Sequence, residues 1–386
     1  MKLIYLSHWR FPSEKTMSPL IMKTCENFAK QGFEVELWVP RRFNFMKKKD
    51  PFQYHEVQHN FEIKYLMAID GTVLKWGFGF LIMVFTYAFN VFVRSYFTKD
   101  YKDAVFYAHD ARDTIFLSLI ARNLFIEAHD FYLSRFSFLN LPFKKARGLI
   151  VTNKIKMKAL METYDIQYNR MIHKPNAVDP EKFNIDSTKE VARNLLGLPQ
   201  DQKIILYAGH LFSWKGVDTL LASHEFLKEN QHIYFIGGSE EDIESFRTKL
   251  VKSGAKNVSV VGNKLHSEVP LWYKAADVLV LPNTAKEEAS KNETSPVKLF
   301  EYMASGVPIV ASDLPSIRNV VNESMVWFFK PDDAGSLAAT IHDALEYKEE
   351  SQNKSLVAKN DVKQYTWSSR IGDISHFIRK IILKNE

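Results

Sequence analysis

The stretch ETSPVKLFEYMASGVPIVASDLP, residues 293–315, contains the transition that decides the fold. Ser295 and Pro296 are typical of a helix start, because a serine hydroxyl accepts backbone N–H groups and proline has no N–H that would go unused. Gly306 is typical of the residue that ends a helix. A helix from Pro296 to about Ser305 is therefore expected to lead into the aliphatic strand PIVAS, which is the repeating step of an α/β fold.

The same alternation continues along the rest of the chain. Short runs rich in Val, Ile and Leu are separated by segments with helical periodicity, which is typical of parallel strands covered by helices on both faces. We therefore predict the α/β class, with doubly wound parallel sheets. The expected strands are KLIYLS, FEVELWVP, DAVFYAH, LFIEAHD, ARGLIVTN, KIILYAG, HIYFIGG, VSVVGN, DVLVLP, PIVAS and MVWFF.

The composition of the chain changes near Pro175, where a polar segment with several Pro and Asn residues links one α/β block to the next. A length of 386 residues with 46% hydrophobic content also favours two domains. We predict a first domain of residues 1–178 and a second domain of residues 179–367. The terminal segment 368–386 is expected to form an amphipathic basic helix that packs back on the first domain.

Charge and cysteine content limit the class of protein. A net charge of +6 indicates a mildly basic surface, which suits anionic ligands or an anionic membrane face, and nothing else favours a nucleic-acid partner. The single cysteine, Cys25, excludes an intrachain disulfide and fits a reducing compartment. The first residues are expected to form a buried strand and not a signal peptide. These features predict a cytoplasmic protein.

One apolar segment raises the question of whether the chain crosses or contacts a membrane. Residues 76–93, WGFGFLIMVFTYAFNVFV, carry no charge and approach the length needed to cross a bilayer. Thr86, Tyr87 and Asn90 make the run more polar, and the strands expected before and after it need to lie in one sheet, on one side of a membrane. We expect a buried or partly membrane-apposed helix, with a true membrane span as the alternative.

Two glutamates flank the helix start in the opening stretch. A helix N-terminus at the carboxyl edge of a doubly wound sheet favours phosphate, so Glu293 and Glu301 could bracket a nucleotide sugar. Two other interpretations stay open from the spacing alone. The glutamates could be a hydrolase pair flanking a glycosidic bond, or surface acids, with Glu301 pairing Lys298 at i, i+3.

Glu293 and Glu301, with seven residues between them and YMASGVPIVASDLPSIRNVV after them, resemble the signature of the family 4 retaining glycosyltransferases (glycosyl transferases group 1). Four further stretches resemble motifs of that family in the right order along the chain. They are FIEAHD, IHKPNAVD, YAGHLFSWKGVDTLL and VSVVGNKLHSEVPLWYKAADVLVLP. The resemblance implies the GT-B fold, in which two Rossmann-like domains face each other across a cleft.

The resemblance also implies a role for each matched residue. Glu301 would bind the ribose hydroxyls of the donor, and Glu293 would face the hydroxyls of the transferred sugar. Lys215 would neutralise the departing diphosphate, and His129 would reach the sugar from the first domain. The other expected donor-binding residues are Gly209, His210 (where the family usually has Arg), Thr294, Ser295, Pro296 and Val297, and, beside the base, Asn263, Lys264 and Leu265.

On the acceptor side, the first strand-to-helix turn, HWRFPSEKTMSP, lacks the paired glycines of many relatives. Thr16 and Ser18 would occupy that place. Asp110, in HDARD (residues 109–113), would lie at a strand end where an acceptor could bind, although capping a helix is the favoured role for an acid of this motif.

The resemblance therefore implies a retaining transferase that moves a sugar from a UDP- or GDP-sugar to a glycan or lipid-linked acceptor, in cell-envelope or exopolysaccharide synthesis. The departing phosphate would take the acceptor proton, so no protein nucleophile is needed, and no catalytic triad stands out. No metal is expected because no cluster with metal-ligand spacing stands out, and no cofactor is expected beside the donor. Phe-rich basic stretches suggest peripheral contact with the inner membrane face. A nucleotide-sugar 2-epimerase of the same architecture and a non-catalytic glycan- or membrane-binding relative stay open as alternatives.

Overall fold

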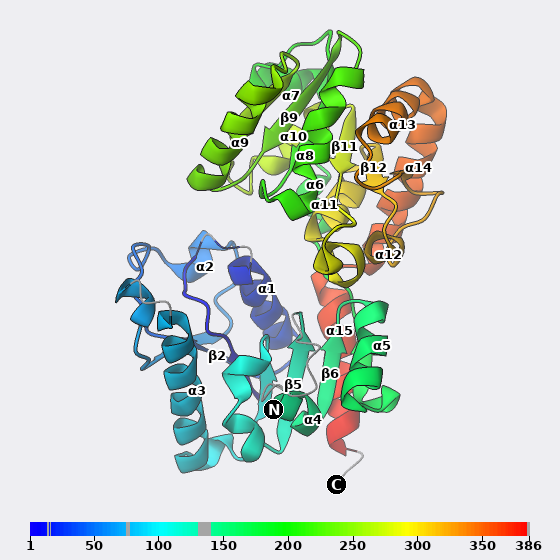
Figure 1. Cartoon of the computed structure of the whole chain (residues 1–386). Helices are drawn as coiled ribbons and strands as arrows, with labels where there is room; N and C mark the ends of the chain where they lie inside the picture. The colour runs from blue at the N-terminus through cyan, green and yellow to red at the C-terminus, as the bar shows by residue number, and fades with distance from the viewer. Residues whose placement is uncertain (14, 16, 75–77, 130–139, 384–386) are drawn as a thin grey trace. The chain divides into compact units, whose positions relative to one another are not determined.

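The computed structural model describes residues 1–13, 15, 17–74, 78–129 and 140–383. The chain divides into two compact units, each built on its own parallel sheet (Figure 1). Unit 1 comprises Met1–Pro175 together with Trp367–Glu386, and unit 2 comprises Asn176–Thr366. The predicted α/β class with two doubly wound parallel sheets is therefore confirmed.

The sheet of unit 1 has seven strands in the order β3-β2-β1-β4-β5-β6-β7. Successive strands are added in one direction from β1 and in the other direction from β4, so the order reverses between these two neighbours. In open α/β sheets, ligands bind outside the carboxyl ends of the strands at such a reversal. The strands are β1 (Lys2–Leu6), β2 (Glu34–Pro40), β3 (Glu62–Leu66), β4 (Val105–Ala108), β5 (Asn123–Ala128), β6 (Gly148–Val151) and β7 (Met171–His173).

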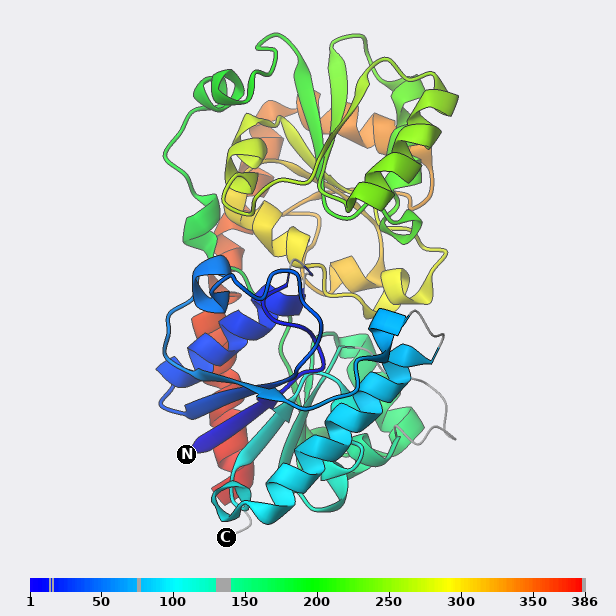
Figure 2. The ribbon, with the colours of Figure 1, turned by 90° about the vertical axis from the view of Figure 1, so that its left-hand side faces the viewer.

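Helices cover both faces of this sheet, because successive residues of a strand point to opposite sides. Leu3 and Tyr5 of β1 belong to the core under α1 and α15, whereas Ile4 and Leu6 belong to the core under α3, α4 and α5. Figure 2 shows α3 running along one face of the sheet. The helices are α1 (Met17–Lys30), α2 (Pro51–Tyr54), α3 (Gly79–Phe97), α4 (Asn140–Lys145), α5 (Lys154–Tyr164) and α15 (Trp367–Leu383).

Helix α15 joins unit 1 from the other end of the chain (Figure 1). Ile371, Ile374 and Ile378 are fully buried in the same core as α1. Their spacing of three or four residues places them on one face of the helix. Arg147 also donates from Nη2 to the carbonyl of Ile381, at 3.1 Å, near the end of α15. Helix α15 is thus part of the core of unit 1.

Helix α3 coincides with most of the uncharged run of residues 76–93, of which 76 and 77 lie outside the described residues. By length and composition it could cross a membrane, but 33% of its most apolar window is buried inside the protein. Met83, Tyr87 and Val91 are fully buried, and the Tyr87 hydroxyl donates to the carbonyl of Trp38 at 2.7 Å. One face of α3 is therefore part of the core of unit 1.

The sheet of unit 2 has six strands in the order β10-β9-β8-β11-β12-β13. They are β8 (Lys203–Ala208), β9 (Gln231–Ile236), β10 (Val258–Gly262), β11 (Val278–Leu281), β12 (Ile309–Ser312) and β13 (Trp327–Phe329). Here the order reverses between β8 and β11. The helices are α6 (Pro180–Phe183), α7 (Lys189–Leu196), α8 (Val217–Ala222), α9 (Glu240–Ser253), α10 (Val269–Ala275), α11 (Val297–Ser305), α12 (Pro315–Arg318), α13 (Ala334–Glu346) and α14 (Lys348–Asp361).

All eleven expected strands are present, and the structure adds β3 and β7. Strand β3, EIKYL, lies at the edge of its sheet, and only Leu66 in it is buried, so it lacks the continuous apolar run of an inner strand. Strand β7 is three residues long and forms the other edge. Both strands were missed because edge strands need little apolar sequence.

Candidate functional site

Glu301, on α11, is a buried charge in unit 2, with 4% of its area exposed. Its Oε2 accepts hydrogen bonds from the Tyr273 hydroxyl at 2.7 Å and from Lys298 Nζ at 2.8 Å. The residues that the structure describes make no hydrogen bond to Oε1, which leaves this oxygen available to a ligand hydroxyl. The i, i+3 pair with Lys298 is therefore present, but it holds a buried carboxylate and not a surface acid.

Lys215 ends the short 3₁₀ turn η6 (Ser213–Lys215), just before α8. Its Nζ lies 3.8 Å from the ring centroid of Trp214. Burial and, next, the charge of Lys298 lower the pKa of Lys215 to about 8. Within the described part of the chain, Lys215 has no carboxylate partner. A desolvated lysine beside a second lysine is a site for a polyanion, because an anion supplies the missing opposite charge.

Gly216 explains how the chain brings Lys215 to this place. Its φ of 72° lies in the left-handed region that favours glycine. A Cβ atom on Gly216 would lie 1.8 Å from the carbonyl oxygen of Pro282, which follows β11. The turn that carries Lys215 therefore lies against the loop after β11 only because residue 216 has no side chain.

The start of α11 differs from the prediction. The helix begins at Val297, and Pro296 is its N-cap with an extended backbone, at ψ 112°. The Ser295 hydroxyl does not cap the helix: it accepts the backbone N–H of Asn176 at 3.2 Å, and the Asn176 amide donates to the Ser295 carbonyl at 2.7 Å. Predicting Ser295 as the N-cap was wrong because Asn176 is too far away in sequence to be recognised as a competing partner.

The residues before α11 form a π-helical turn, η8 (Ala289–Glu293). Glu293 and Thr294 are half-buried, as are Ser295 and Val297. The Thr294 N–H donates to the carbonyl of Ala289 at 2.9 Å and closes the turn. Single π turns are uncommon in proteins, and those that occur are often at functional sites. Glu293, Thr294 and Val297 stay predictions for sugar and phosphate contacts.

The remaining predicted donor residues follow β8 and β10. The His210 ring stacks on Phe212 with centroids 4.9 Å apart, and its Nδ1 lies 3.5 Å from Oδ2 of Asp242. Gly209 lies directly before His210. After β10, Asn263 and Leu265 are exposed, and Lys264 Nζ lies 5.7 Å from the ring centroid of Trp272. Because the strands are parallel, these loops lie at the same edge of the sheet as the start of α11.

In unit 1, His129 follows β5 and is held by a buried carboxylate. Its Nε2 lies 2.5 Å from Oε1 of Glu127, which also accepts from Arg370 Nη2 at 2.6 Å, while the Tyr107 hydroxyl donates to Oε2. Burial alone would raise the pKa of Glu127, but the charges of Arg370 and His129 hold it well below its usual value. The ionised Glu127 therefore orients His129, and Arg370 of α15 fixes Glu127.

Next to His129 lies a second buried histidine. The ring centroids of His109 and His129 are 4.3 Å apart. Burial and, next, the charge of His129 lower the pKa of His109 to about 3. His109 is therefore neutral near pH 7.

The predicted acceptor-side residues have local partners in the structure. Asp110 is the N-cap of the turn η3 (Ala111–Thr114), accepts the Arg112 N–H at 2.8 Å and pairs with its guanidinium. The capping role favoured from sequence is therefore present. Ser18, in α1, is fully buried and lies 3.0 Å from Nε2 of His55. Thr16 lies outside the described residues.

Two pairs that the sequence did not single out lie at the same sheet edge in unit 1. One is Glu127 with Arg370, and the other is His8 with Asp113. The sequence carried only a weak signal for them. HDARD contains two acids, of which the capping rule selects Asp110, and His8 has no neighbour that marks it beyond its place after a buried strand.

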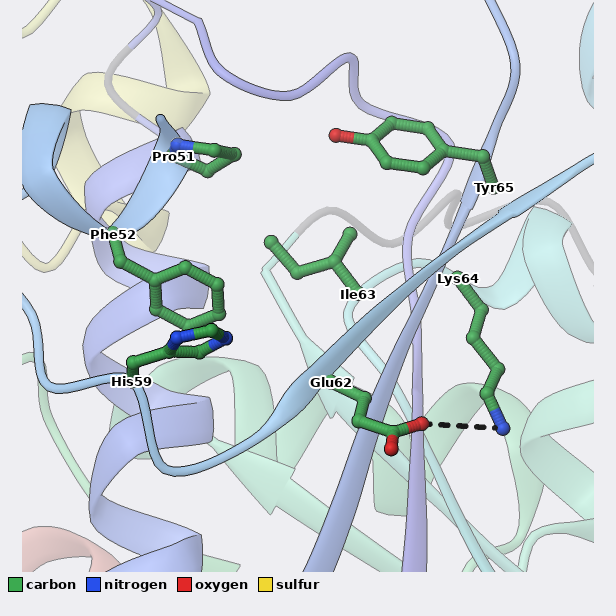
Figure 3. A pocket seen from close by; sticks show the side chains of 7 residues that line it. All are labelled: Pro51, Phe52, His59, Glu62, Ile63, Lys64 and Tyr65. Atoms are coloured by element: carbon green, nitrogen blue, oxygen red, sulfur yellow. Dashed lines mark ion pairs between the residues drawn. The ribbon is translucent and has the colours of Figure 1, made fainter. Parts of the chain in front are cut away.

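A hollow of about 510 Å³ lies beside β3 (Figure 3). It contains no predicted site residue, and its ion pair, between Glu62 and Lys64 at 3.5 Å, joins partly solvated groups. We assign no function to it, because β3 is an edge strand and not one of the two strands at the reversal. Its lining is formed by Pro51, Phe52, His59, Glu62, Ile63, Lys64 and Tyr65.

Sequence relatives cover part of the chain. Residues 188–360 match the family described as glycosyl transferases group 1. The chain is 28% identical over 183 residues to a D-inositol 3-phosphate glycosyltransferase of Xylanimonas cellulosilytica, covering 45% of this chain and 42% of the relative. It is 22% identical over 242 residues to an alpha-monoglucosyldiacylglycerol synthase of Streptococcus pneumoniae, covering 59% of this chain and 48% of the relative. The chain thus spans less than half of the length of these two relatives.

Solved structures match nearly the whole chain. Sucrose-phosphate synthase from Thermosynechococcus elongatus has a TM-score of 0.80 and 17% identity, covering 99% of both chains. HepE of Anabaena, in complex with UDP-glucose, has a TM-score of 0.76 and 16% identity, covering 98% of this chain and 100% of that chain. At these identities the likeness establishes the fold. The family resemblance is thus confirmed for residues 188–360, which match the glycosyl transferases group 1 family, and the chain has the GT-B type of fold.

Proposed function

We propose that this protein is a glycosyltransferase that moves a sugar from a nucleotide diphosphate sugar to an acceptor hydroxyl. The observation that carries the proposal is that Lys215 and Glu301 both lie near Lys298 in unit 2. Lys215 is a desolvated cation suited to a diphosphate, and Glu301 is a buried carboxylate with one oxygen available to ribose hydroxyls. Both residues lie inside the region that matches the glycosyl transferases group 1 family. The UDP-glucose complex of HepE supports a UDP-sugar as the donor.

The chemistry follows from where charge develops. When the bond between the anomeric carbon and the diphosphate breaks, its electron pair stays on the diphosphate oxygen. Lys215, with Lys298 nearby, stabilises that growing negative charge, and groups already in place cost no reorganisation at that moment. The bound diphosphate also raises the pKa of Lys215 and keeps the ammonium protonated. We assign His129, oriented by Glu127, to the transferred sugar.

We further propose that the sugar is transferred with retention of anomeric configuration and without a metal or other cofactor. Retention is the outcome that the family resemblance implies. Support for metal independence comes from Lys215 and Lys298, which supply the positive charge that Mg²⁺ supplies in many phosphate-handling enzymes. The same resemblance gives GDP-sugars as the alternative donors.

The acceptor that we propose is a glycan or a lipid-linked sugar at an anionic membrane face. Helix α3 has an exposed apolar stripe, which we define as Phe78, Leu81, Phe85, Phe89 and Tyr96, each between 51% and 74% exposed. Basic residues are exposed at the end of α3 and just beyond it, at Arg94, Lys99 and Lys102. Apolar side chains beside lysine and arginine are the combination that binds anionic lipid surfaces. The glycolipid named for the Streptococcus pneumoniae relative agrees with such an acceptor.

Donor binding and turnover test the proposal. The purified chain would be incubated with a panel of UDP- and GDP-sugars and candidate acceptors, and release of nucleoside diphosphate would be followed. Replacing Lys215 by Met is expected to lower turnover by about 100-fold or more, as loss of one group that stabilises developing charge does. Glu301→Gln is expected to weaken donor binding by about 10-fold or more, the effect of a lost charged hydrogen bond.

The matched controls are Lys252→Met and Glu349→Gln, which change exposed residues of α9 and α14. Wild-type protein that binds and turns over no nucleotide sugar would contradict the proposal. So would Lys215→Met and Glu301→Gln variants that behave like their controls. Formation of a sugar epimer without acceptor would instead identify a 2-epimerase.

A further inference from the structure

Three aromatic side chains lie in a column beside Lys215, in the loop that follows β8. They belong to the alternate residues His210, Phe212 and Trp214, and we call them the aromatic column. The rings of His210 and Phe212 are parallel to within 4°, with centroids 4.9 Å apart. Those of Phe212 and Trp214 are parallel to within 19°, with centroids 6.5 Å apart. Nζ of Lys215 lies 3.8 Å from the Trp214 centroid, so the column ends at a cation.

Backbone hydrogen bonds hold this end of the aromatic column. The Lys215 N–H donates to the carbonyl of Phe212 at 2.9 Å, and the N–H of Thr284, after β11, donates to the Trp214 carbonyl at 3.4 Å. Strands β8 and β11 are the neighbours at which the strand order of unit 2 reverses. Ligands of open α/β sheets bind at such a reversal, so the column lies at a ligand-binding edge.

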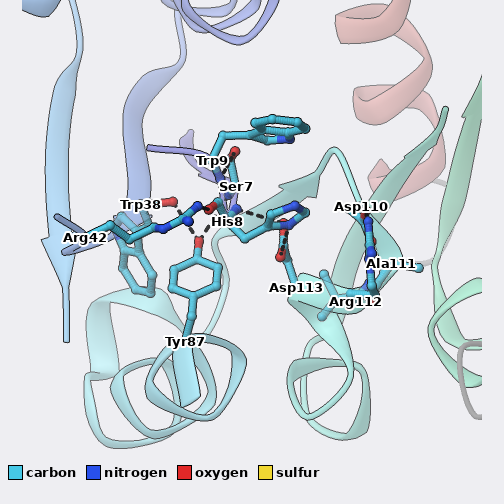
Figure 4. A network of polar contacts seen from close by, with 11 residues as sticks. Ser7, His8, Trp9, Trp38, Arg42, Tyr87, Asp110, Ala111, Arg112 and Asp113 are labelled. Atoms are coloured by element: carbon cyan, nitrogen blue, oxygen red, sulfur yellow. Dashed lines mark hydrogen bonds and ion pairs between the residues drawn. The ribbon is translucent and has the colours of Figure 1, made fainter. Parts of the chain in front are cut away.

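The corresponding loop of unit 1 supports its titratable side chain in another way (Figure 4). The ring of His8, just after β1, has its Nδ1 2.8 Å from Oδ1 of Asp113, and Trp9 stacks on it with centroids 5.6 Å apart. A carboxylate supports a positive charge and also cancels it. An aromatic face attracts an ammonium through its quadrupole and carries no charge of its own. Lys215, supported by a ring, therefore keeps its charge for an anion.

The other charged groups near this turn have partners of their own. They are Lys298 and Glu301 of α11, Asp218 of α8, Asp242 and Lys249 of α9, and His210 of the aromatic column. Lys298 binds Glu301 at 2.8 Å, Lys249 binds Asp218 at 2.7 Å, and Asp242 faces His210 at 3.5 Å. Within the described residues, no carboxylate forms an ion pair with Lys215. Burial and, next, the charge of Lys298 lower the pKa of Lys215 from its ordinary 10.5 to about 8.

We propose that Trp214, backed by Phe212 and His210, is a positioning residue that holds the Lys215 ammonium at the diphosphate site without neutralising it. The ring favours the charged form of the lysine, which burial and the charge of Lys298 disfavour. The inference rests on the diphosphate-binding role proposed above for Lys215. It adds that donor binding has an alkaline limit, which Lys215 sets and the Trp214 ring moves to higher pH.

The effect of the ring on Lys215 is measurable without enzyme activity. Carbon-13 NMR of the full chain with isotope-labelled lysine gives the pKa of Lys215, whose signal is the one missing from Lys215→Met. In Trp214→Leu, which keeps an apolar side chain without a π face, we expect this pKa to fall by about one unit, the effect of losing a cation–π contact of about five-fold or more. Trp214→Phe keeps a π face and is expected to restore most of the shift.

A matched control is Trp327→Leu, at the amino end of β13. Trp327 is also half-buried in unit 2, and Nζ of Lys354 lies 4.8 Å from its ring centroid. Loss of this ring removes a second contact of the same kind, away from the loop that follows β8. We expect the pKa of Lys215 to be the same in this variant as in the wild type.

The pH dependence of UDP binding is the second measurement. The ammonium must be protonated to attract the diphosphate, so UDP affinity is full below the pKa of Lys215 and declines above it. Calorimetry of the wild type is expected to show a loss of about 10-fold between pH 7 and pH 9. The decline is expected to begin about one pH unit lower in Trp214→Leu, and to be absent from Lys215→Met, which binds weakly throughout.

The outcomes separate this inference from the proposed function. If Trp214→Leu has the wild-type pKa of Lys215 and the wild-type pH dependence, the role of Trp214 fails, and the glycosyltransferase assignment stands. If the wild type binds no UDP, the proposed function fails, and the NMR comparison still decides whether the ring supports the lysine. If Trp214→Leu does not fold, Trp214→Met takes its place, because methionine also fills apolar space and has no π face. A wild-type UDP affinity that is equal at pH 7 and pH 9 overturns the alkaline limit.

Discussion

Charged side chains at the two sheet edges have two different kinds of surroundings. Glu127 is surrounded by partners: Arg370, His129 and Tyr107 all bind its carboxylate. Lys215 has an aromatic ring and a second lysine beside it, and no carboxylate among the described residues. A buried charge that is fully paired serves to position its neighbours, whereas one left without an opposite charge favours a charged ligand. We therefore expect Glu127 to matter through His129, and Lys215 through the donor.

Replacing Arg370 by Met tests the positioning network. The change leaves the Glu127 carboxylate buried without its main countercharge. We expect the free energy of unfolding to fall by about 3 to 5 kcal/mol, the usual cost of removing one partner of a buried ion pair. Denaturant unfolding measures this loss, and Lys380→Met, at an exposed position of the same helix, is the control. Equal stability of the two variants would show that Arg370 does not support Glu127.

Sequence separation explains which contacts could be foreseen. The pair of Lys298 with Glu301 and the cap by Asp110 join residues three and two positions apart, so helix and turn periodicity is enough to predict them. Residues 105 positions apart form the His8–Asp113 pair, and residues 243 positions apart form the Arg370–Glu127 pair. No local pattern predicts such pairs, because the order of the strands in the sheet decides which loops meet.

Among the elements, α3 is apolar both on its buried face and on its exposed face. One face packs on the sheet through Met83, Tyr87 and Val91, and the other carries the apolar stripe defined above. Such an unbalanced surface is unusual for a helix of a compact domain, whose outward face is normally polar. The helix is therefore the element through which we expect unit 1 to approach a membrane.

Vesicle binding tests this role of α3. Replacing both Leu81 and Phe89 by Ser is expected to weaken binding to vesicles with anionic lipids by about 10-fold or more, since burying each such side chain contributes about 1.5 to 3 kcal/mol. Flotation of vesicles measures the effect, and the double change Val251→Ser with Leu356→Ser, at exposed sites of unit 2, is the control. Binding that is unaffected by the α3 changes, or equally affected by the control, contradicts the proposal.

The sequence predicts elements best where an element is buried on both sides. Inner strands such as β4 and β11 read as unbroken apolar runs and were all expected. Edge strands β3 and β7 were missed, because half of an edge strand faces solvent or because it is too short for a pattern to show. The start of α11 was placed one residue early, since Pro296 fits both the N-cap and the first turn.

At the scale of the whole molecule, each unit has its own sheet and its own cores, but only unit 2 is a continuous segment. Unit 1 needs α15, whose Ile371, Ile374 and Ile378 fill the core beside α1. The two units therefore depend differently on the last residues of the chain. Stability lost by removing α15 should be confined to unit 1.

Deleting residues 367–386 tests this division. Loss of three buried isoleucines removes about 5 kcal/mol or more, comparable to the whole stability of an ordinary domain. Calorimetry of the shortened chain is expected to show one remaining transition, which coincides with that of residues 176–366 alone and rises in temperature with UDP. Two transitions unchanged from the full chain would show that α15 is dispensable for unit 1.

The return of α15 also sets the order of events on the ribosome. Residues 176–366 are synthesised after most of unit 1 and before α15. At about 5–20 residues per second, the synthesis of this segment takes roughly 10 to 40 seconds. Throughout that interval the nascent first unit lacks the helix that covers one face of its sheet, and the Glu127 carboxylate lacks Arg370. The edge that carries His129 is thus completed last, and a chain whose translation stops before α15 carries a finished unit 2 without a finished unit 1.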